Sequence, residues 1–241
     1  NMDILNELNE VQAQAVTTTD GPVMIIAGPG SGKTRVLTYR IAYLIQKGID
    51  PFRILSLTFT NKAAAEMRER IQHIVGGEAK NIFMGTFHSV FARILRMDAQ
   101  KLGYPTNFTI YDTNDAKNLL KGIIKEEGLN DKIYKPSNVY FRISSAKNSL
   151  IGPEDYQTNP DLVTEDQQMG RPLTGKLYEK YQNRLFKAGA MDFDDLLFNT
   201  NVLLRDHPKV LHKYQHKFKY ILVDEYQDTN HAQYRLVAEL V

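Results

Sequence analysis

The sequence predicts an α/β protein with a parallel β-sheet whose chain is interrupted by a mainly helical block. Three observations predict this class. Four short apolar runs are typical of strands buried on both faces, helical patterns separate the first three, and a long helical stretch precedes the fourth. The expected strands are "VMII" (23–26), "ILSLTF" (54–59), "IFMGTF" (82–87) and "YILVD" (220–224).

Two amphipathic helices are expected between the first three strands. The first lies in "RVLTYRIAYLIQKG" and ends at Gly48, and the second lies in "NKAAAEMRERIQHIVGG" and ends in Gly76-Gly77. This alternation of strands and helices is typical of a parallel sheet. The apolar positions at helical spacing are Val36, Ile41, Leu44 and Ile45 in the first helix and Ala64, Met67, Ile71 and Ile74 in the second.

The helical block begins near Ser89 and ends near Lys217. We therefore expect a core domain formed by residues 1–88 and 218–241, with an inserted helical domain formed by residues 89–217. The chain stops at "AQYRLVAELV", inside a helical pattern without a capping glycine or proline. We expect it to be the N-terminal part of a longer protein, with a core that is incomplete at its C-terminus.

Composition excludes several classes of protein. The 241 residues carry 30 basic and 28 acidic side chains, so a basic surface would have to be local. The absence of cysteine excludes disulfides and thiolate metal sites and favours a reducing compartment. The sequence shows neither a signal peptide nor an apolar run of membrane-spanning length, so we expect a cytoplasmic protein with no membrane partner.

The segment "AGPGSGKT" (27–34) joins the first strand to a helix, which is the context of a phosphate-binding loop. Its small residues let successive N–H groups point at phosphate oxygens at the positive end of the helix. Lys33 would bind the outer phosphates, and Thr34 would offer its hydroxyl to Mg²⁺. The alternative is a glycine-rich turn with a chance Lys-Thr pair. The expected binding residues are Ala27 (where the usual pattern has glycine), Gly28, Pro29, Gly30, Ser31, Gly32, Lys33 and Thr34.

An acidic segment, "ILVDEYQDTN" (221–230), supplies the groups that a phosphate loop lacks for hydrolysis. Asp224 ends a buried strand and can complete the Mg²⁺ shell beside Thr34. Glu225 follows and can accept a proton from the attacking water. Alone, the pair could be a solvated acidic turn. Together with the phosphate loop it predicts a nucleoside triphosphatase whose catalytic residues are Lys33, Asp224 and Glu225.

Further strings extend the pattern along essentially the whole chain, and two of them, "TFTNKAAAEM" and "DEYQDTN", are long and specific. Together the strings resemble the UvrD/Rep branch of superfamily 1 helicases, which are ATP-driven motors on single-stranded DNA. The resemblance implies a RecA-like core interrupted by a helical domain, with ATP and Mg²⁺ as cofactors. The other matching strings are "LNEVQAQAV" (8–16), "AGPGSGKTR", "MGTFHSVFARILR" (84–96) and "MDFDDLL" (191–197).

The resemblance also implies roles for single residues. Gln12 would read the adenine edge with its amide, and Arg35 would stack its guanidinium on the base. Gln227 and Asp228 would couple the phosphates to the DNA. From the residues alone, a helix surface position is the preferred interpretation for Gln12 and the alternative for Arg35, and Gln227 and Asp228 could equally be plain loop residues.

Two further segments, "TFTNK" (58–62) and "GTFH" (85–88), follow buried strands and should emerge at the same edge of the sheet as the phosphate loop. Aromatic rings stack on any base, while hydroxyl, amide and ammonium groups hold phosphates. The alternative places both phenylalanines in the core and makes Asn61 a helix cap. With the resemblance, the segments predict single-stranded DNA contacts by Phe59, Thr60, Asn61, Lys62, Thr86, Phe87 and His88.

The helical block contains two more segments of interest. "KIYKPSNVYFRISSAKNS" (132–149) fits a surface that follows a nucleic-acid backbone, but it also fits a solvated helix with its aromatic rings inward, which is the preferred interpretation. "MDFDDLL" carries Asp192, Asp194 and Asp195. We expect these acids to be helix N-terminal residues at a domain seam, without a chemical role.

The sequence therefore predicts the N-terminal, ATP-binding part of a DNA helicase that moves on single-stranded DNA and unwinds duplex, in repair or replication. The implied partners are single-stranded DNA, single-strand/duplex junctions, a second RecA-like core of the same protein and DNA repair proteins. Because the second core would supply an arginine to the γ-phosphate, the fragment alone should be poorly active. The alternatives are a nuclease-associated recombination helicase, a P-loop phosphotransferase and a non-motor, nucleotide-dependent DNA-binding module.

Overall fold

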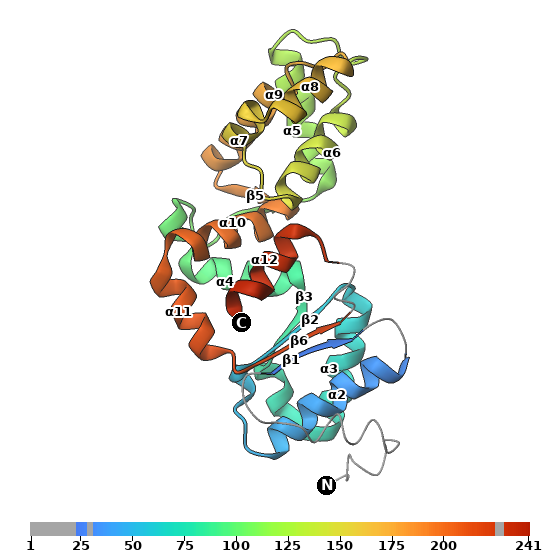
Figure 1. Ribbon diagram of the computed structural model, residues 1–241, viewed down its shortest axis with the longest axis vertical. Helices are drawn as coiled ribbons and strands as arrows, with labels where there is room; N and C mark the ends of the chain where they lie inside the picture. The colour runs from blue at the N-terminus through green and yellow to red at the C-terminus, as the bar shows by residue number, and fades with distance from the viewer. Residues whose placement is uncertain (1–22, 28–30, 225–228) are drawn as a thin grey trace. The chain divides into compact units, whose positions relative to one another are not determined.

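The computed structural model describes residues 23–27, 31–224 and 229–241, with backbone only for residues 23–27 and 31–34 (Figure 1). The chain forms two compact units. The first contains the described residues up to Val90 together with His207–Thr229 and Val237–Val241. The second contains Phe91–Asp206 and Asn230–Leu236. In the part of the chain that is described, no helix is long and apolar enough to cross a membrane.

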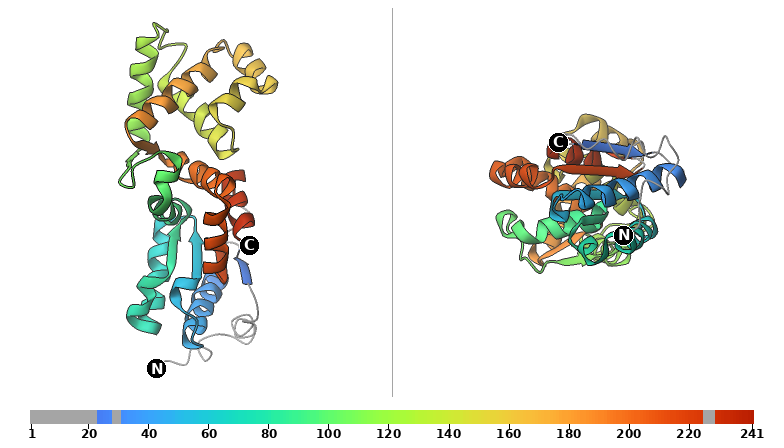
Figure 2. Two further views of the ribbon diagram at one scale, coloured as in Figure 1. Left: turned by 90° about the vertical axis from the view of Figure 1, so that its left-hand side faces the viewer. Right: turned by 90° about the horizontal axis from the view of Figure 1, so that it is seen from below.

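A four-stranded parallel sheet forms the centre of the first unit. Its strands β1 (Val23–Ala27), β6 (Tyr220–Asp224), β2 (Ile54–Thr58) and β3 (Phe83–Thr86) lie in this order. The right-hand view of Figure 2 shows β6, in red, beside β1, in blue. The parallel sheet predicted from four apolar runs is therefore confirmed.

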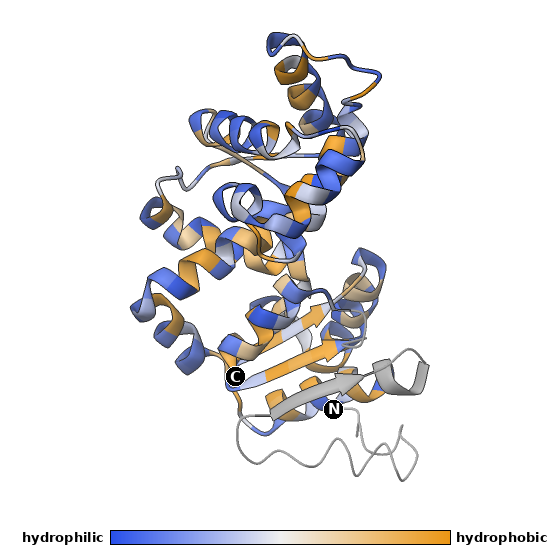
Figure 3. Ribbon diagram, turned by 45° about the horizontal axis from the view of Figure 1, so that its top comes forward, coloured by the Kyte–Doolittle hydropathy of each residue, from blue (hydrophilic) through white to orange (hydrophobic). Residues whose placement is uncertain are grey.

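Burial on both faces explains why these runs form strands. Every residue of β2 and β6 is buried, and Figure 3 shows these two strands largely in the colour of hydrophobic residues. Helices α2 (Ser31–Gln46) and α3 (Asn61–Val75) pack beside each other and share one hydrophobic core with the sheet. This core includes Leu37, Ile41, Leu44, Met67, Ile71, Ile54, Met84, Tyr220 and Leu222.

The remaining elements of the first unit precede or follow the strands along the chain. Helix α11 belongs to this unit, and after it Phe218 packs edge-on against Phe83 of β3, with ring centroids 5.3 Å apart. The expected domain boundaries at 88/89 and 217/218 stay a prediction. These remaining elements are η2 (Pro51–Arg53), η3 (Gly76–Asn81), the start of α4 (Phe87–Asp98), α11 (Pro208–Lys217) and the end of α12 (His231–Leu240).

The second unit is mainly helical and has its own core, in which Tyr178 and Tyr181 are completely buried. It also contains a short parallel pair of strands, β4 (Thr109–Tyr111) and β5 (Ala190–Asp192). Its helical elements are η4 (Ala99–Leu102), α5 (Thr113–Glu126), α6 (Pro136–Asn148), α7 (Pro153–Thr158), α8 (Pro160–Gln168), α9 (Thr174–Lys187) and α10 (Phe193–Asp206).

A buried ion cluster joins four elements of this unit. Lys147 Nζ of α6 lies 2.8 Å from Asp192 Oδ2 and 2.9 Å from Asp195 Oδ1, and all three side chains are at most 1% exposed. The Tyr181 hydroxyl of α9 donates to Asp192 Oδ2 at 2.7 Å. Burial alone would lower the pKa of Lys147, but the two carboxylates raise it well above its usual value, so the lysine stays charged.

The two aspartates of this cluster also begin helix α10. The Asp195 backbone N–H donates to Asp192 Oδ1 at 2.8 Å, and the Asp192 N–H donates back to Asp195 Oδ2 at 3.1 Å, as in a capping box. Asp194 and Asp195 lie in the first turn of the helix, as the sequence predicts for helix N-terminal acids. Burial, together with the charge of Asp192, raises the pKa of Asp194 to about 6.

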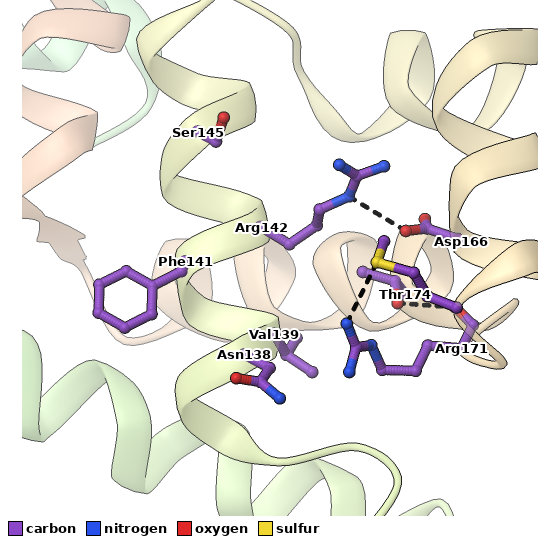
Figure 4. A pocket seen from close by; sticks show the side chains of 9 residues that line it. Asn138, Val139, Phe141, Arg142, Ser145, Asp166, Arg171 and Thr174 are labelled. Carbon is purple, nitrogen blue, oxygen red and sulfur yellow. Dashed lines mark hydrogen bonds and ion pairs between the residues drawn. The ribbon is translucent and has the colours of Figure 1, made fainter.

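The basic segment 132–149 differs in part from the preferred interpretation. Tyr134 and Tyr140 are buried as expected, but the ring of Phe141 is 60% exposed and Lys147 is buried rather than solvated. Helix α6 also lines a pocket of about 330 Å³, together with residues that include Asp166 and Arg171 (Figure 4). There Arg142 Nε donates to Asp166 Oδ1 at 3.1 Å and to the Tyr156 hydroxyl at 2.9 Å.

Candidate functional site

The carboxyl ends of the four parallel strands meet at one edge of the first unit. Ala27 pairs with Asp224, Leu57 pairs with Val223 and with Gly85, and Thr58 pairs with Thr86. The segments that follow these strands therefore leave the sheet at the same level. This is the edge at which ligands bind in open α/β sheets.

The structure describes only part of the predicted nucleotide-binding segments at this edge. Helix α2 begins at Ser31, soon after β1 ends at Ala27, so its first N–H groups face the carboxyl edge of the sheet. Asp224 ends β6 and is 6% exposed. Outside the described residues lie Gln12, Gly28, Pro29, Gly30, Glu225, Gln227 and Asp228, together with the side chains of Ala27, Ser31, Lys33 and Thr34.

Arg35 is described and lies in the first turns of α2. Its guanidinium carbon is 5.5 Å from the ring centroid of Tyr39, one helical turn further on. This distance is within the range of a cation–π contact, which holds the guanidinium beside the aromatic ring.

Thr60 begins helix α3 on the other side of the edge. Its hydroxyl accepts a hydrogen bond from the Ala63 N–H at 3.0 Å, which makes Thr60 the N-cap. Asn61 and Lys62 follow in the first turn, and both are exposed. The cap that the alternative interpretation assigned to Asn61 is thus supplied by Thr60, and the Asn61 amide remains at the surface.

Thr86 has the same position before helix α4. The Ser89 N–H donates to Thr86 Oγ1 at 3.2 Å, and the two hydroxyls lie 3.0 Å apart. A threonine therefore caps a helix at each of these strand ends: Thr60 follows β2, and Thr86 is the last residue of β3. The N-terminal ends of α3 and α4 consequently present N–H groups at the edge where α2 also begins, and such ends favour anions.

The two phenylalanines of the predicted DNA contacts differ in exposure. Phe87 is 1% exposed, so it has no free ring face for a base, and its predicted stacking role is not supported by this structure. Its ring centroid lies 5.4 Å from that of Phe59, which is only half-buried. Phe87 therefore supports Phe59 from the core, and Phe59 is the ring that can reach a base.

His88 follows Phe87 and is partly buried. Burial lowers the pKa of His88 below its usual value, because the charged imidazolium loses solvation. The neutral ring can donate one hydrogen bond and accept another, but it does not contribute a positive charge at neutral pH. His88 is therefore suited to a polar contact rather than to an ion pair with a phosphate.

The sequence did not single out Thr58 and Arg68, which tie the two segments together. Thr58 is 1% exposed, and its Oγ1 lies 3.3 Å from the Gly85 carbonyl oxygen. Arg68 of α3 donates from a terminal guanidinium nitrogen to the Met84 carbonyl oxygen at 2.7 Å. In the sequence, only the position of Thr58 at the end of a predicted buried strand could have indicated such a role.

Replacing Thr60 with alanine is expected to lower the free energy of unfolding by about 1 kcal/mol, because the Ala63 N–H loses its capping acceptor. Thr60→Ser keeps the hydroxyl and should restore most of this loss. Urea unfolding followed by circular dichroism measures both variants. Equal stability of Thr60→Ala and the parent protein would show that the cap is not formed in solution.

A parallel α/β sheet in which a helix carrying Gly-Lys-Thr begins beside an acidic strand end defines the RecA-like class of P-loop nucleoside triphosphatases. Residues 8–241 match the family described as the UvrD/REP helicase N-terminal domain. Because this match covers nearly the whole sequence, the chain belongs to that family, as its motifs predict. The helical second unit agrees with the expected helical insertion.

Individual relatives agree with the family. Over 235 residues the chain is 48% identical to the ATP-dependent DNA helicase PcrA of Staphylococcus epidermidis (strain ATCC 35984) and to the protein of the same name from Staphylococcus aureus (strain Mu50). These matches cover 97% of this chain but 31% of each relative. The chain thus spans just under one third of the length of these curated relatives.

Proposed function

We propose that the protein containing this chain is an ATP-dependent DNA helicase that moves on single-stranded DNA and unwinds duplex. One observation carries the proposal: the paired strand ends bring the phosphate-loop strand, the acidic strand and both predicted DNA segments to one edge of the sheet. Hydrolysis at one part of this edge can therefore act directly on a strand bound at the other part. The family and the names of its relatives support the same activity.

The nucleotide half fits ATP with Mg²⁺. The residues from Ala27 to Thr34 would hold the phosphates, with Lys33 neutralising charge on the outer ones. Thr34 and Asp224 are the candidate ligands of the metal, and the register of Ala27 with Asp224 favours this pairing. Mg²⁺ would supply charge neutralisation on the transferred phosphoryl group.

Other residues of this chain would carry out the proton transfer and recognise the nucleotide. Glu225 would orient the attacking water and accept its proton. Gln12 would recognise adenine through an amide that donates and accepts, and Arg35 would stack its guanidinium on the base. Gln227 and Asp228 would connect the phosphates to the DNA side.

The DNA half would use the segments after β2 and β3. Phe59 would stack on a base, and Thr60, Asn61, Lys62, Thr86 and His88 would contact the backbone together with the helix ends of α3 and α4. None of these contacts depends on the identity of the base. This suits a motor that must move along DNA of any sequence. We also propose that a second RecA-like core of the same protein closes the ATP site and that duplex junctions are substrates.

Phe59→Ala in the full-length protein is expected to weaken binding of an oligothymidylate about 5- to 150-fold, because a stacked base contributes about 1–3 kcal/mol. Fluorescence anisotropy with labelled oligonucleotide measures this change. Loss of single-stranded DNA binding should be accompanied by loss of strand separation on a tailed duplex.

Phe52→Ala is the matched control for this variant. Phe52 is also a partly exposed phenylalanine (43%), but it lies in η2, before β2 begins, and so belongs to the opposite edge of the sheet. Its removal should leave the affinity for the oligonucleotide unchanged. If both variants bind as the parent does, or if the full-length protein shows no DNA-stimulated ATP hydrolysis, the proposed site is wrong.

A further inference from the structure

Two hydrogen bonds join the β2–α3 segment to consecutive carbonyl groups of β3. Thr58 Oγ1 lies 3.3 Å from the Gly85 carbonyl oxygen and the same distance from the carbonyl oxygen of Thr60. Because a hydroxyl has one proton, it donates to one of them at a time. Arg68 donates to the Met84 carbonyl oxygen at 2.7 Å, within the range of a strong charge-assisted bond.

These bonds lie at or directly before the first residues of the two predicted DNA segments. Thr58 comes directly before Phe59, and Gly85 comes directly before Thr86. The side chain of Thr58 is almost completely enclosed, so it is shielded from any ligand. Arg68 reaches β3 from the third turn of α3, the helix that Thr60 caps. Both side chains therefore connect the two segments through hydrogen bonds to main-chain carbonyl groups.

The end of β3 has little freedom to adjust. A Cβ atom added at Gly85 would lie 2.6 Å from Ser89 Oγ, so the strand end is closely packed against the first turn of α4. The hydroxyl of Ser89 is itself engaged with Thr86. A shift of the Gly85 carbonyl group would thus also move Thr86 and the start of α4.

We propose that Thr58 and Arg68 are positioning residues that hold the 58–62 and 85–88 segments in a fixed relation, so that both contact one DNA strand at the same time. This inference rests on the proposed function. Without the two bonds, each segment can still contact the DNA. The bound DNA must then fix the two segments relative to each other, and this ordering costs binding free energy. That cost falls on DNA binding and leaves the ATP site unaffected.

The test uses Thr58→Val and Thr58→Ser in the full-length protein. Valine keeps the shape but removes the donor, and we expect the oligothymidylate concentration for half-maximal stimulation of ATP hydrolysis to rise about three- to tenfold, as befits one lost hydrogen bond. The value of kcat at saturating DNA and the KM for ATP should stay within about twofold. Serine restores the hydroxyl and should return the DNA dependence to that of the parent.

Ser56→Ala is the matched control, because it removes another buried hydroxyl (1% exposed) from the middle of the same strand. It should leave the DNA dependence unchanged. Arg68→Gln changes a residue on the exposed side of α3. It is also expected to raise the oligothymidylate concentration for half-maximal stimulation of ATP hydrolysis. This second variant keeps the test decisive if Thr58→Val does not fold.

Three results would be informative. A parent protein without DNA-stimulated hydrolysis overturns the proposed function itself. A stimulated parent with unchanged Thr58→Val and Arg68→Gln overturns the positioning role alone. A parallel loss of kcat, ATP affinity and DNA affinity in these variants, shared by Thr58→Ser, also overturns it, because that pattern indicates a general structural defect.

Discussion

Lys147→Met is expected to lower the free energy of unfolding of the helical unit by about 3–5 kcal/mol, the usual cost of removing one partner from a buried ion cluster. The substitution leaves Asp192 and Asp195 without their cation at a site where all three side chains are at most 1% exposed. It also removes the lysine from beside the ring of Tyr181, whose centroid lies 5.1 Å from Nζ. Urea unfolding followed by circular dichroism measures the loss.

The pH dependence of this variant gives a second test. Without Lys147, burial favours the protonated forms of both carboxyl groups, so their pKa values rise in the folded state above those in the unfolded state. The folded variant then binds more protons than the unfolded one, and its stability falls as the pH rises. The deficit relative to the parent should therefore be smaller at about pH 5 than at about pH 8.

Lys176→Met is the control, because Lys176 forms an exposed pair with Glu179 and should contribute little to stability. Adding Asp192→Asn to Lys147→Met should recover part of the lost stability, since it removes one uncompensated charge. Equal stability of Lys147→Met and Lys176→Met would contradict the account of the cluster.

Glu225→Gln in the full-length protein is expected to reduce kcat for DNA-stimulated ATP hydrolysis by about 10²–10⁴-fold, the range for loss of a general base. The amide keeps the size of the side chain but accepts a proton far less readily. Binding of ATP should persist, because the proposed phosphate and metal contacts belong to other residues. Single-turnover hydrolysis and titration with a fluorescent ATP analogue measure the two quantities separately.

Glu78→Gln is the matched control, since Glu78 is an exposed acid in η3, before β3 begins, at the opposite edge of the sheet. It should hydrolyse ATP as the parent does. Retained hydrolysis in Glu225→Gln would assign the base to another group. Parallel loss of ATP binding would assign Glu225 to the binding of the nucleotide instead.

Local patterns in the sequence were sufficient for the sheet but not for every strand. The apolar runs that became β2 and β6 are buried along their whole length, so composition alone identified them. Strands β4 and β5 were not predicted, because each has three residues and pairs with a segment far away in the sequence. No local periodicity reports such a pairing.

The candidate site, too, could be predicted from the sequence only in part. The common edge follows from the parallel direction of the strands, which the α/β pattern predicted, but the position of β6 between β1 and β2 was not predicted. The burial of Phe87 and the capping by Thr60 depend on which face of the local backbone meets the core, and adjacent residues of one motif differ in this respect. Lys147 illustrates the same limit, because its buried partners, Asp192 and Asp195, lie on other elements of the unit.

The place of β6 in the sheet has a consequence for biosynthesis. β6 leaves the ribosome after nearly all of the helical unit, yet it lies between β1 and β2. The emerging chain must therefore carry two apolar segments whose common neighbour does not yet exist, and such unpaired segments are prone to aggregate. The helical unit can fold in the meantime, so we expect nascent chains that stop before Tyr220 to bind chaperones through β1 and β2.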